Sequence, residues 1–143
     1  MKRMKIMICS SMSFASEIVA MKKKLESEGH KAFIPYDTDD VVKNPMLTKD
    51  LDADLKHCIE KDVMKKCFDL LAKSDAILVL NYTKHDTPGY IGTSVLMEIG
   101  LAHHLGKKIF ILNPLPDYHE ERWAHEVHIM QPIILNGDLR KIK

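Results

Sequence analysis

The stretch Ala76-Ile77-Leu78-Val79-Leu80 decides the fold of this chain. All five side chains are apolar, so the stretch lacks the polar alternation of a strand with one face in water. A run of this length and character is typical of a central strand that is covered on both faces. It predicts a parallel sheet that lies between two layers of helices.

The same kind of signal repeats over the rest of the chain. Four more short apolar runs are interpreted as strands, at residues 6–9, 32–34, 108–112 and 133–135. Segments with helical spacing alternate with them, which implies parallel strands joined by right-handed crossovers. No repeat or Gly/Ser-rich linker interrupts the alternation, so residues 1–143 are expected to form a single domain. Five strands favour a doubly wound, flavodoxin-like α/β fold with strand order 2-1-3-4-5.

The connections are expected to be helices of different lengths and two loops. Helices are predicted from residue 14 to 28, from about 52 to 73, from 93 to about 105, and, more briefly, around residues 120–130. The polar residues 36–50 are interpreted as a long loop of the kind that often forms a lid or a binding loop. Residues 81–92 form a second predicted loop.

Composition excludes several classes of partner. The formal net charge is only +1, so no general attraction to nucleic acid polymers or anionic membranes is expected. No apolar run approaches the roughly 20 residues that a membrane-spanning helix needs. The three cysteines, Cys9, Cys58 and Cys67, are odd in number and widely spaced, which favours reduced thiols in a cytoplasmic protein.

Ligands of doubly wound sheets bind where the strand order reverses, here between the first and third strands. This rule brings Ser10, Ser11 and Ser13 close to Asn81 and Tyr82, and we interpret all five as candidate binding residues. The chain has no Walker A and no GxGxxG motif. Serine hydroxyls at a helix start can nevertheless bind a phosphate, although Ser13 can equally serve as a helix cap.

Glu98 is the candidate catalytic residue. It lies within an apolar helical segment, residues 92–102, near the end where the helix dipole favours an anion. A carboxylate in such surroundings must face a cleft or be paired, because an isolated buried charge is too costly. Facing a cleft, it can attack the anomeric carbon of a sugar and stabilise an oxocarbenium-like transition state. The alternative is an exposed glutamate or a local ion pair.

These residues carry a resemblance to a known family. The segments involved are Ser74-Asp75 before the central strand, Gly92-Thr93-Ser94, Glu98-Ile99-Gly100-Leu101-Ala102 and Gly106-Lys107-Lys108. The pattern resembles the nucleoside 2-deoxyribosyltransferase superfamily, which includes the 2'-deoxynucleoside 5'-phosphate N-hydrolases. The resemblance implies a flavodoxin-like homodimer or higher homo-oligomer without a cofactor. It also implies that Glu98 is the nucleophile and that Gly92, Thr93 and Ser94 bind the substrate.

The resemblance further implies an aspartate that positions the sugar, on the helix before the central strand. Asp62 and Asp69 are the candidates, and Asp62 is preferred, although each can form an ordinary surface ion pair with a lysine four residues away. The chain departs from the family pattern in two places. Gly92 lies six residues before Glu98, and no glycine follows the first strand. Tyr82 and Tyr90 can stack on a base or simply pack.

Three functions follow as expectations. The first is cleavage or transfer at the N-glycosidic bond of a nucleoside, a deoxynucleoside or its 5'-monophosphate, with Glu98 as the nucleophile. The second is a nucleotide-binding module without turnover, and the third is an NAD glycohydrolase. No metal site is expected, because His125 and His128, with Glu121 one turn earlier, lack a further ligand of clear spacing.

Overall fold

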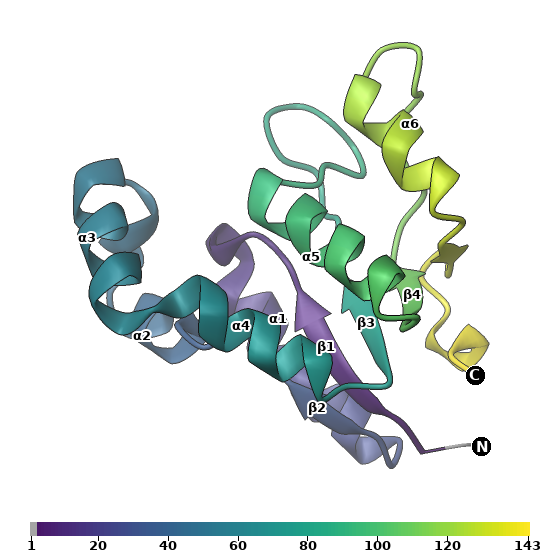
Figure 1. The fold of residues 1–143 in the computed structure, drawn as a ribbon, viewed down its shortest axis with the longest axis horizontal. Helices are drawn as coiled ribbons and strands as arrows, with labels where there is room; N and C mark the ends of the chain where they lie inside the picture. The colour runs from purple at the N-terminus through teal and green to yellow at the C-terminus, as the bar shows by residue number, and fades with distance from the viewer. Residues whose placement is uncertain (1–2) are drawn as a thin grey trace.

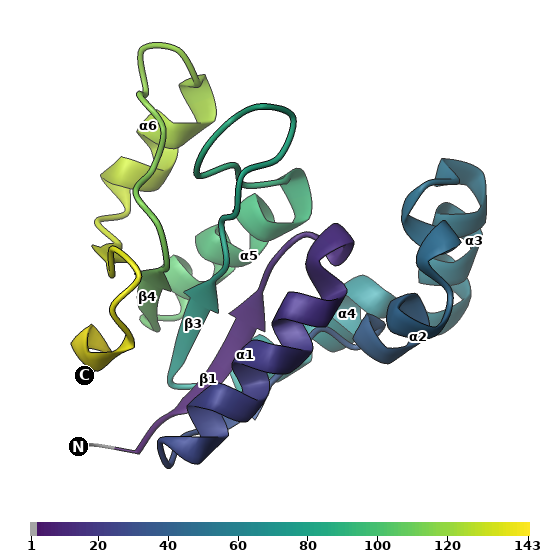
Figure 2. The same ribbon diagram turned by 180° about the vertical axis from the view of Figure 1, so that it is seen from behind.

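The computed structural model describes residues 3–143 and contains one five-stranded sheet (Figures 1 and 2). All strand pairs are parallel, and the order across the sheet is β2-β1-β3-β4-β5. The strands are β1 (Lys5–Cys9), β2 (Lys31–Phe33), β3 (Ala76–Val79), β4 (Lys108–Ile111) and β5 (Ile133–Ile134). The predicted flavodoxin-like architecture is therefore confirmed.

Helices connect successive strands and cover both faces of the sheet (Figures 1 and 2). The α-helices are α1 (Ala15–Ser27), α2 (Thr38–Lys43), α3 (Leu51–Lys61), α4 (Val63–Ala72), α5 (Thr93–His104) and α6 (Arg122–Ile129). Three 3-10 turns accompany them, η1 (Met12–Phe14), η2 (Pro45–Thr48) and η3 (Leu139–Lys141). Figure 2 shows α1 in front of the sheet, whereas α4 and α5 cover the opposite face.

Strand β1 divides its side chains between two cores, as the period of a strand requires. Ile6 and Ile8 belong to the core under α1, while Met7 and Cys9 belong to the core under α4 and α5. The strand register pairs Cys9 with Val79, so β1 and β3 end at the same level. Cys9 therefore lies at the carboxyl edge of the sheet, on the face that α5 covers.

Two expectations about the segment between β2 and β3 were wrong. The helix predicted over residues 52–73 is broken at Asp62, which adopts a left-handed conformation with φ 51° between α3 and α4. The loop predicted over residues 36–50 contains α2 and η2. The break was missed because the helical spacing of apolar residues continues across it. The short helix α2 was missed because residues 36–50 are mostly polar. As a result, α2, η2 and α3 form a helical lobe beside the sheet (Figure 1).

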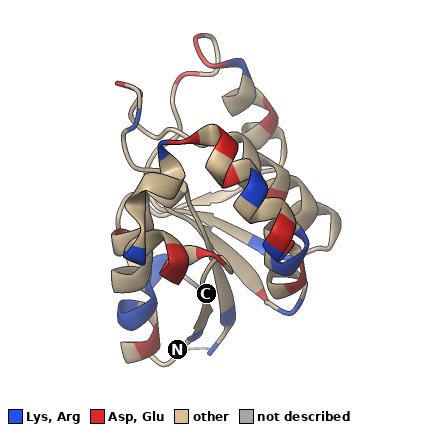
Figure 3. Ribbon diagram, turned by 90° about the vertical axis from the view of Figure 1, so that its left-hand side faces the viewer, with Lys and Arg blue, Asp and Glu red and all other residues tan. Residues whose placement is uncertain are grey.

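The surface carries both signs of charge. In Figure 3, positions of Lys and Arg are interspersed with positions of Asp and Glu along the helices that face the viewer. Within residues 3–143, no helix is both long enough and apolar enough to cross a membrane. A charged ligand therefore has to be held by particular side chains rather than by a general field.

Candidate functional site

A pocket of about 540 Å³ opens at the carboxyl edge of the sheet, above the ends of β1 and β3. This is the position at which doubly wound sheets bind their ligands. Its walls come from the turn after β1, the residues after β2, the helical lobe, the start of α4 and the first turns of α5. Its lining residues include Ser10, Ser11, Ser13, Asp37, Leu51, Asp54, Leu55, Cys58, Met64, Cys67, Phe68, Lys84, Tyr90, Gly92, Thr93, Ser94 and Glu98.

Glu98 lies on the inner side of α5, with only 7% of its surface exposed. Val95, Ile99 and Ala102 are buried on the same side of the helix, so the spacing that packs α5 on the sheet also turns Glu98 inward. The thiol of Cys9 donates a hydrogen bond to Oε2 of Glu98 at 3.5 Å. The buried face of α5 thus places a carboxyl group beside the last residue of β1.

Burial changes the acidity of this carboxyl group. Loss of hydration raises the pKa of Glu98 to about 7, and the charge of Asp37 adds to the increase. The hydrogen bond from Cys9 acts in the opposite direction, because it stabilises the charged form. Glu98 is therefore close to half ionised at neutral pH. The pKa of the Cys9 thiol is raised well above its ordinary value, by burial first and then by Glu98.

A polar cluster lies at another part of the pocket. Lys84, from the loop after β3, donates a hydrogen bond from Nζ to Oγ of Ser11 at 2.8 Å. The hydroxyls of Ser11 and Ser13 are 2.9 Å apart. Ser11 also caps the turn that precedes α1 by accepting from the backbone N–H of Ser13 at 3.4 Å, so the predicted cap at Ser13 is replaced by one at Ser11. A lysine and two hydroxyls can together hold an anion.

Ser10 lines the same pocket but has a structural partner. Its hydroxyl donates to the carbonyl oxygen of Leu80 at 2.8 Å, which ties the end of β1 to the end of β3. The predicted binding residues Gly92, Thr93 and Ser94 also line the pocket, where α5 begins. No side chain caps this helix at Gly92, so the N–H groups of its first turn are available to an anion.

Asn81 and Tyr82 do not line this pocket, although they were expected to lie beside Ser10, Ser11 and Ser13; they line a second pocket of about 630 Å³. Asn81 is buried and bonds to the backbone of Asn113 twice, through Nδ2 to the carbonyl oxygen and through Oδ1 from the N–H, both at 2.8 Å. It therefore clamps the loops after β3 and β4 together. Tyr82 packs edge to face on Phe14, with ring centroids 5.1 Å apart.

The structure brings neither aspartate candidate to Glu98. Asp62 is exposed at the junction of α3 and α4 and is not a lining residue of the pocket. Asp69 lies on the exposed side of α4, where its carboxylate is 3.4 Å from Nζ of Lys65. The physical reason is the break at Asp62, which shifts the helical face on which the two residues were expected to lie together.

Asp37 is a pocket residue that the sequence analysis missed. It lies four residues after Phe33, the last residue of β2, is 4% exposed and lines the pocket together with Glu98. Burial raises its pKa, and its own backbone N–H offsets part of this increase. The signal that could have found it is its position after a strand, because the carboxyl ends of parallel strands meet at one edge.

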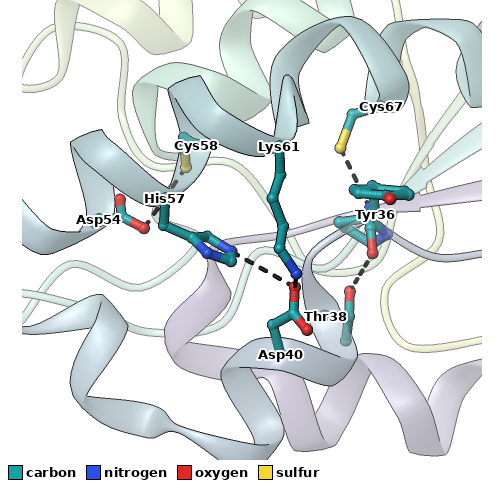
Figure 4. Close-up of polar contacts among 9 residues, drawn as sticks. Tyr36, Thr38, Asp40, Asp54, His57, Cys58, Lys61 and Cys67 are labelled. Atoms are coloured by element: carbon teal, nitrogen blue, oxygen red, sulfur yellow. Dashed lines mark hydrogen bonds and ion pairs between the residues drawn. The ribbon is translucent and has the colours of Figure 1, made fainter.

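The helical lobe forms the remaining wall, and polar contacts join α2 to α3 within it (Figure 4). Oδ2 of Asp40 in α2 lies 3.0 Å from Nζ of Lys61 in α3 and 3.6 Å from Nε2 of His57. The backbone N–H of Tyr36 donates to Sγ of Cys67 in α4 at 3.4 Å. These contacts hold α2, α3 and α4 around the pocket.

Residues 3–143 contain no group of three or more His, Cys, Asp or Glu side chains placed to bind a metal ion. Glu121 instead accepts a hydrogen bond from the indole of Trp123 at 3.1 Å. His125 lies 3.0 Å from the guanidinium of Arg122. The pocket itself offers carboxyl, hydroxyl and amino groups.

Comparison of the chain with protein-family models, with curated proteins and with solved structures gave no significant match.

Proposed function

We propose that this protein cleaves or transfers the N-glycosidic bond of a nucleoside, a deoxynucleoside or, preferentially, its 5'-monophosphate, with Glu98 as the nucleophile. The observation that carries the proposal is the buried Glu98 carboxyl group in a pocket at the strand-order reversal of the sheet. The resemblance of residues 74–108 to the nucleoside 2-deoxyribosyltransferase superfamily supports the same role for this residue.

Cleavage of an N-glycosidic bond by this route requires a carboxylate beside the anomeric carbon of the sugar. The ionised form of Glu98 attacks C1', the bond from C1' to the base breaks, and a glycosyl ester forms on the carboxylate. Water then releases the sugar, or a second base accepts it. Near neutral pH a substantial share of Glu98 is ionised, because its pKa is about 7.

The preference for a 5'-monophosphate is proposed from the polar cluster of Ser11, Ser13 and Lys84. Among residues 3–143, several lysines form ion pairs with carboxylates, but Lys84 does not. Its ammonium group donates a hydrogen bond to Ser11 instead. A phosphate dianion can accept hydrogen bonds from the ammonium and hydroxyl groups. The uncapped first turn of α5 supplies further N–H donors.

The base is proposed to lie against the apolar side of the pocket. Leu55, Met64 and Phe68 line it from the helical lobe and α4, and Tyr90 lines it from the loop before α5. Aromatic and apolar surfaces of this kind accept the flat faces of purines and pyrimidines without choosing strongly among them.

A second candidate function is nucleotide binding without turnover. One observation favours it. A Glu98 that is half protonated at neutral pH can act as a hydrogen-bond donor to a ligand and not only as a nucleophile. The anion-binding cluster does not depend on Glu98, so binding would survive replacement of this residue. A third candidate is an NAD glycohydrolase, in which Leu51, an exposed residue of the pocket wall, would contact the longer ligand.

The test is release of free base from a panel of nucleosides, nucleoside 5'-monophosphates, deoxynucleoside 5'-monophosphates and NAD, measured by chromatography. We expect base from a monophosphate with the native protein and none with Glu98→Gln, which keeps the size of the side chain. Binding is measured in parallel by calorimetry. A monophosphate that binds but gives no base with either protein would establish the binding module instead.

Two accompanying proposals concern the state of the protein. The family resemblance leads us to propose a homodimer or higher homo-oligomer, which light scattering after gel filtration checks. We also propose a cytoplasmic location, because the three cysteines are free and the pKa of each thiol is raised by burial. The proposed reaction uses no cofactor, since the nucleophile and the proton donors are side chains.

A further inference from the structure

The loop that follows β3 folds back on itself as a two-residue hairpin. Lys84 and Thr87 form an isolated antiparallel bridge, in which the N–H of Thr87 donates to the carbonyl oxygen of Lys84 at 2.9 Å and the N–H of Lys84 donates back at 3.2 Å. His85 and Asp86, at the tip, have φ values of 52° and 58°. Two successive positive φ values are typical of a type I′ turn. Residues 82–90, the flap, extend beyond the carboxyl end of β3 (Figures 1 and 2).

The conformation of the tip is costly for the residues that adopt it. A type I′ turn favours asparagine or glycine at its two central positions, because a Cβ crowds the left-handed backbone. His85 and Asp86 are both exposed, so burial of their side chains does not explain the turn. Strained backbone of this kind persists where the surrounding structure imposes it, and it is concentrated at ligand-binding sites.

The base of the flap is fixed against the loop that follows β4. Gly89 is buried, with φ 75°, and a Cβ at this position would collide with the carbonyl oxygen of Pro114. Nδ2 of Asn81, just before the flap, donates to the carbonyl oxygen of Asn113 at 2.8 Å. The backbones of the two loops are therefore in direct contact, which leaves the flap little freedom to pivot.

The tip of the flap is held from the side by a row of three rings. The ring of His85 packs edge to face on Tyr90, with ring centroids 5.3 Å apart. Tyr90 packs in the same way on Trp123 of α6, at 6.2 Å. The indole N–H of Trp123 in turn donates to Oε2 of Glu121 at 3.1 Å. Helix α6 thus supports the tip in addition to the contacts at the base.

The turn determines where the side chain of Lys84 begins. From this position, Nζ reaches the turn after β1 and donates to Oγ of Ser11 at 2.8 Å. The ammonium group has three donors, of which Ser11 occupies one, and no carboxylate of residues 3–143 forms an ion pair with it. The flap therefore presents a cation to the pocket, beside the hydroxyls of Ser11 and Ser13.

We propose that the flap determines the specificity of the pocket for a 5'-phosphate, with His85 and Asp86 as positioning residues whose left-handed backbone holds Lys84 at the phosphate. This inference rests on the proposed function, in which the phosphate of a nucleoside 5'-monophosphate binds to Ser11, Ser13 and Lys84. A cation that is already in place loses less conformational entropy when the phosphate binds, so the preformed turn increases affinity. The effect is confined to ligands that carry the phosphate.

The test changes the backbone preference at the tip while the charge stays matched. Asp86→Gly and Asp86→Val both remove the exposed carboxylate, but glycine adopts a positive φ freely, whereas a β-branched residue opposes it. Calorimetry measures Kd for a deoxynucleoside 5'-monophosphate and for the matching deoxynucleoside. Relative to Asp86→Gly, we expect Asp86→Val to raise Kd for the monophosphate about tenfold, the effect of losing a hydrogen bond to a charged group, and to leave Kd for the nucleoside within about twofold.

A second background shows whether the tip acts through Lys84. In Lys84→Ala the ammonium group is absent, so Asp86→Val and Asp86→Gly should bind the monophosphate equally. Asp86→Asn, which tolerates the left-handed region, should resemble Asp86→Gly. Thermal unfolding compares the variants, and Asp86→Ala, which opposes the turn less strongly than valine, takes the place of Asp86→Val if valine prevents folding.

The outcomes distinguish this inference from the function on which it rests. Equal Kd values of Asp86→Val and Asp86→Gly for the monophosphate, equal losses on monophosphate and nucleoside, or a difference that persists in Lys84→Ala overturn the positioning role. A native protein that binds both compounds equally, or neither, rejects the phosphate site and the inference with it. Base release is measured separately with Glu98→Gln as control. Its absence overturns the proposed cleavage, while the ratio of the two Kd values still reports on the flap.

Discussion

The thiol of Cys9 donates to Oε2 of Glu98 at 3.5 Å and thereby joins the last residue of β1 to the middle of α5. Neither residue is close to the other in sequence. The contact exists because β1 alternates its side chains between two cores and because the buried face of α5 includes Glu98. The pKa of the candidate nucleophile Glu98 therefore depends on a residue of β1.

Replacement of Cys9 by alanine should raise the pKa of Glu98. The hydrogen bond from the thiol lowers that pKa, so its loss favours the protonated form. The acidic limb of kcat/KM against pH should therefore move to higher pH, with little change on the alkaline side. A limb that stays in place would mean that Glu98 does not control the acidic side of the profile.

Glu98 should make the protein less stable as the pH rises. Its pKa is raised by folding from an ordinary value of 4.5 to about 7, so the native state binds the proton more tightly than the unfolded state. The cost of ionising the buried group is absent below pH 4.5 and grows until the pH exceeds about 7. The full difference corresponds to about 3 kcal/mol. Relative to the native protein, Glu98→Gln should thus gain stability between pH 5 and pH 8, as urea unfolding at each pH would measure.

Replacement of Lys84 by alanine should weaken binding of the phosphate and leave the rest of the substrate unaffected. A hydrogen bond to a charged group contributes about 1.5 to 3 kcal/mol, which corresponds to roughly 10- to 100-fold in KM. The increase is expected for a nucleoside 5'-monophosphate and not for the matching nucleoside. Lys24→Ala, an exposed lysine on α1 outside the pocket, is the control. Equal effects on nucleoside and monophosphate would remove the phosphate from this end of the pocket.

Replacement of Asn81 by alanine should act on stability. The buried side chain of Asn81 makes two hydrogen bonds of 2.8 Å with the backbone of Asn113, and the partly buried N–H and carbonyl groups of Asn113 would lose their partner. We expect a loss of about 1 to 3 kcal/mol in the free energy of unfolding. Urea unfolding of the variant provides the measurement, and an unchanged midpoint would mean that water replaces the amide.

Replacement of Asp62 by glycine should be neutral or stabilising by up to about 1 kcal/mol. Its φ of 51° lies in the left-handed region, which is costly for residues with a Cβ and free for glycine. Thermal unfolding measures the change. The same variant tests the position of Asp62 outside the pocket, because a large loss of base release would return it to the candidate site.

The sheet could be predicted from the sequence because its strands are short apolar runs separated by helices. Residues 76–80 alone indicated a buried central strand, and the strand count then favoured the order that the structure has. Glu98 could be placed as well, since an acidic residue inside an apolar helix has few acceptable locations.

The side on which loop residues lie could not be predicted. Asn81 and Tyr82 follow β3 as expected, but Asn113 and Phe14 draw them away from the pocket. The left-handed conformation of Asp62 could not be predicted, because the spacing of apolar residues is the same on both sides of it. Asp37 was missed because the polar residues around it were interpreted as a loop.

The helical lobe has a consequence for how the substrate range of such a protein changes. Leu51, Asp54 and Leu55 form part of the pocket wall, yet they belong to a segment between β2 and α4 that contributes no strand to the sheet. No residue of α3 is fully buried. The sequence of α3 can therefore change without changes in β1 and α5, the elements that position Cys9 and Glu98. Recruitment of new substrates is thus separable from preservation of the fold.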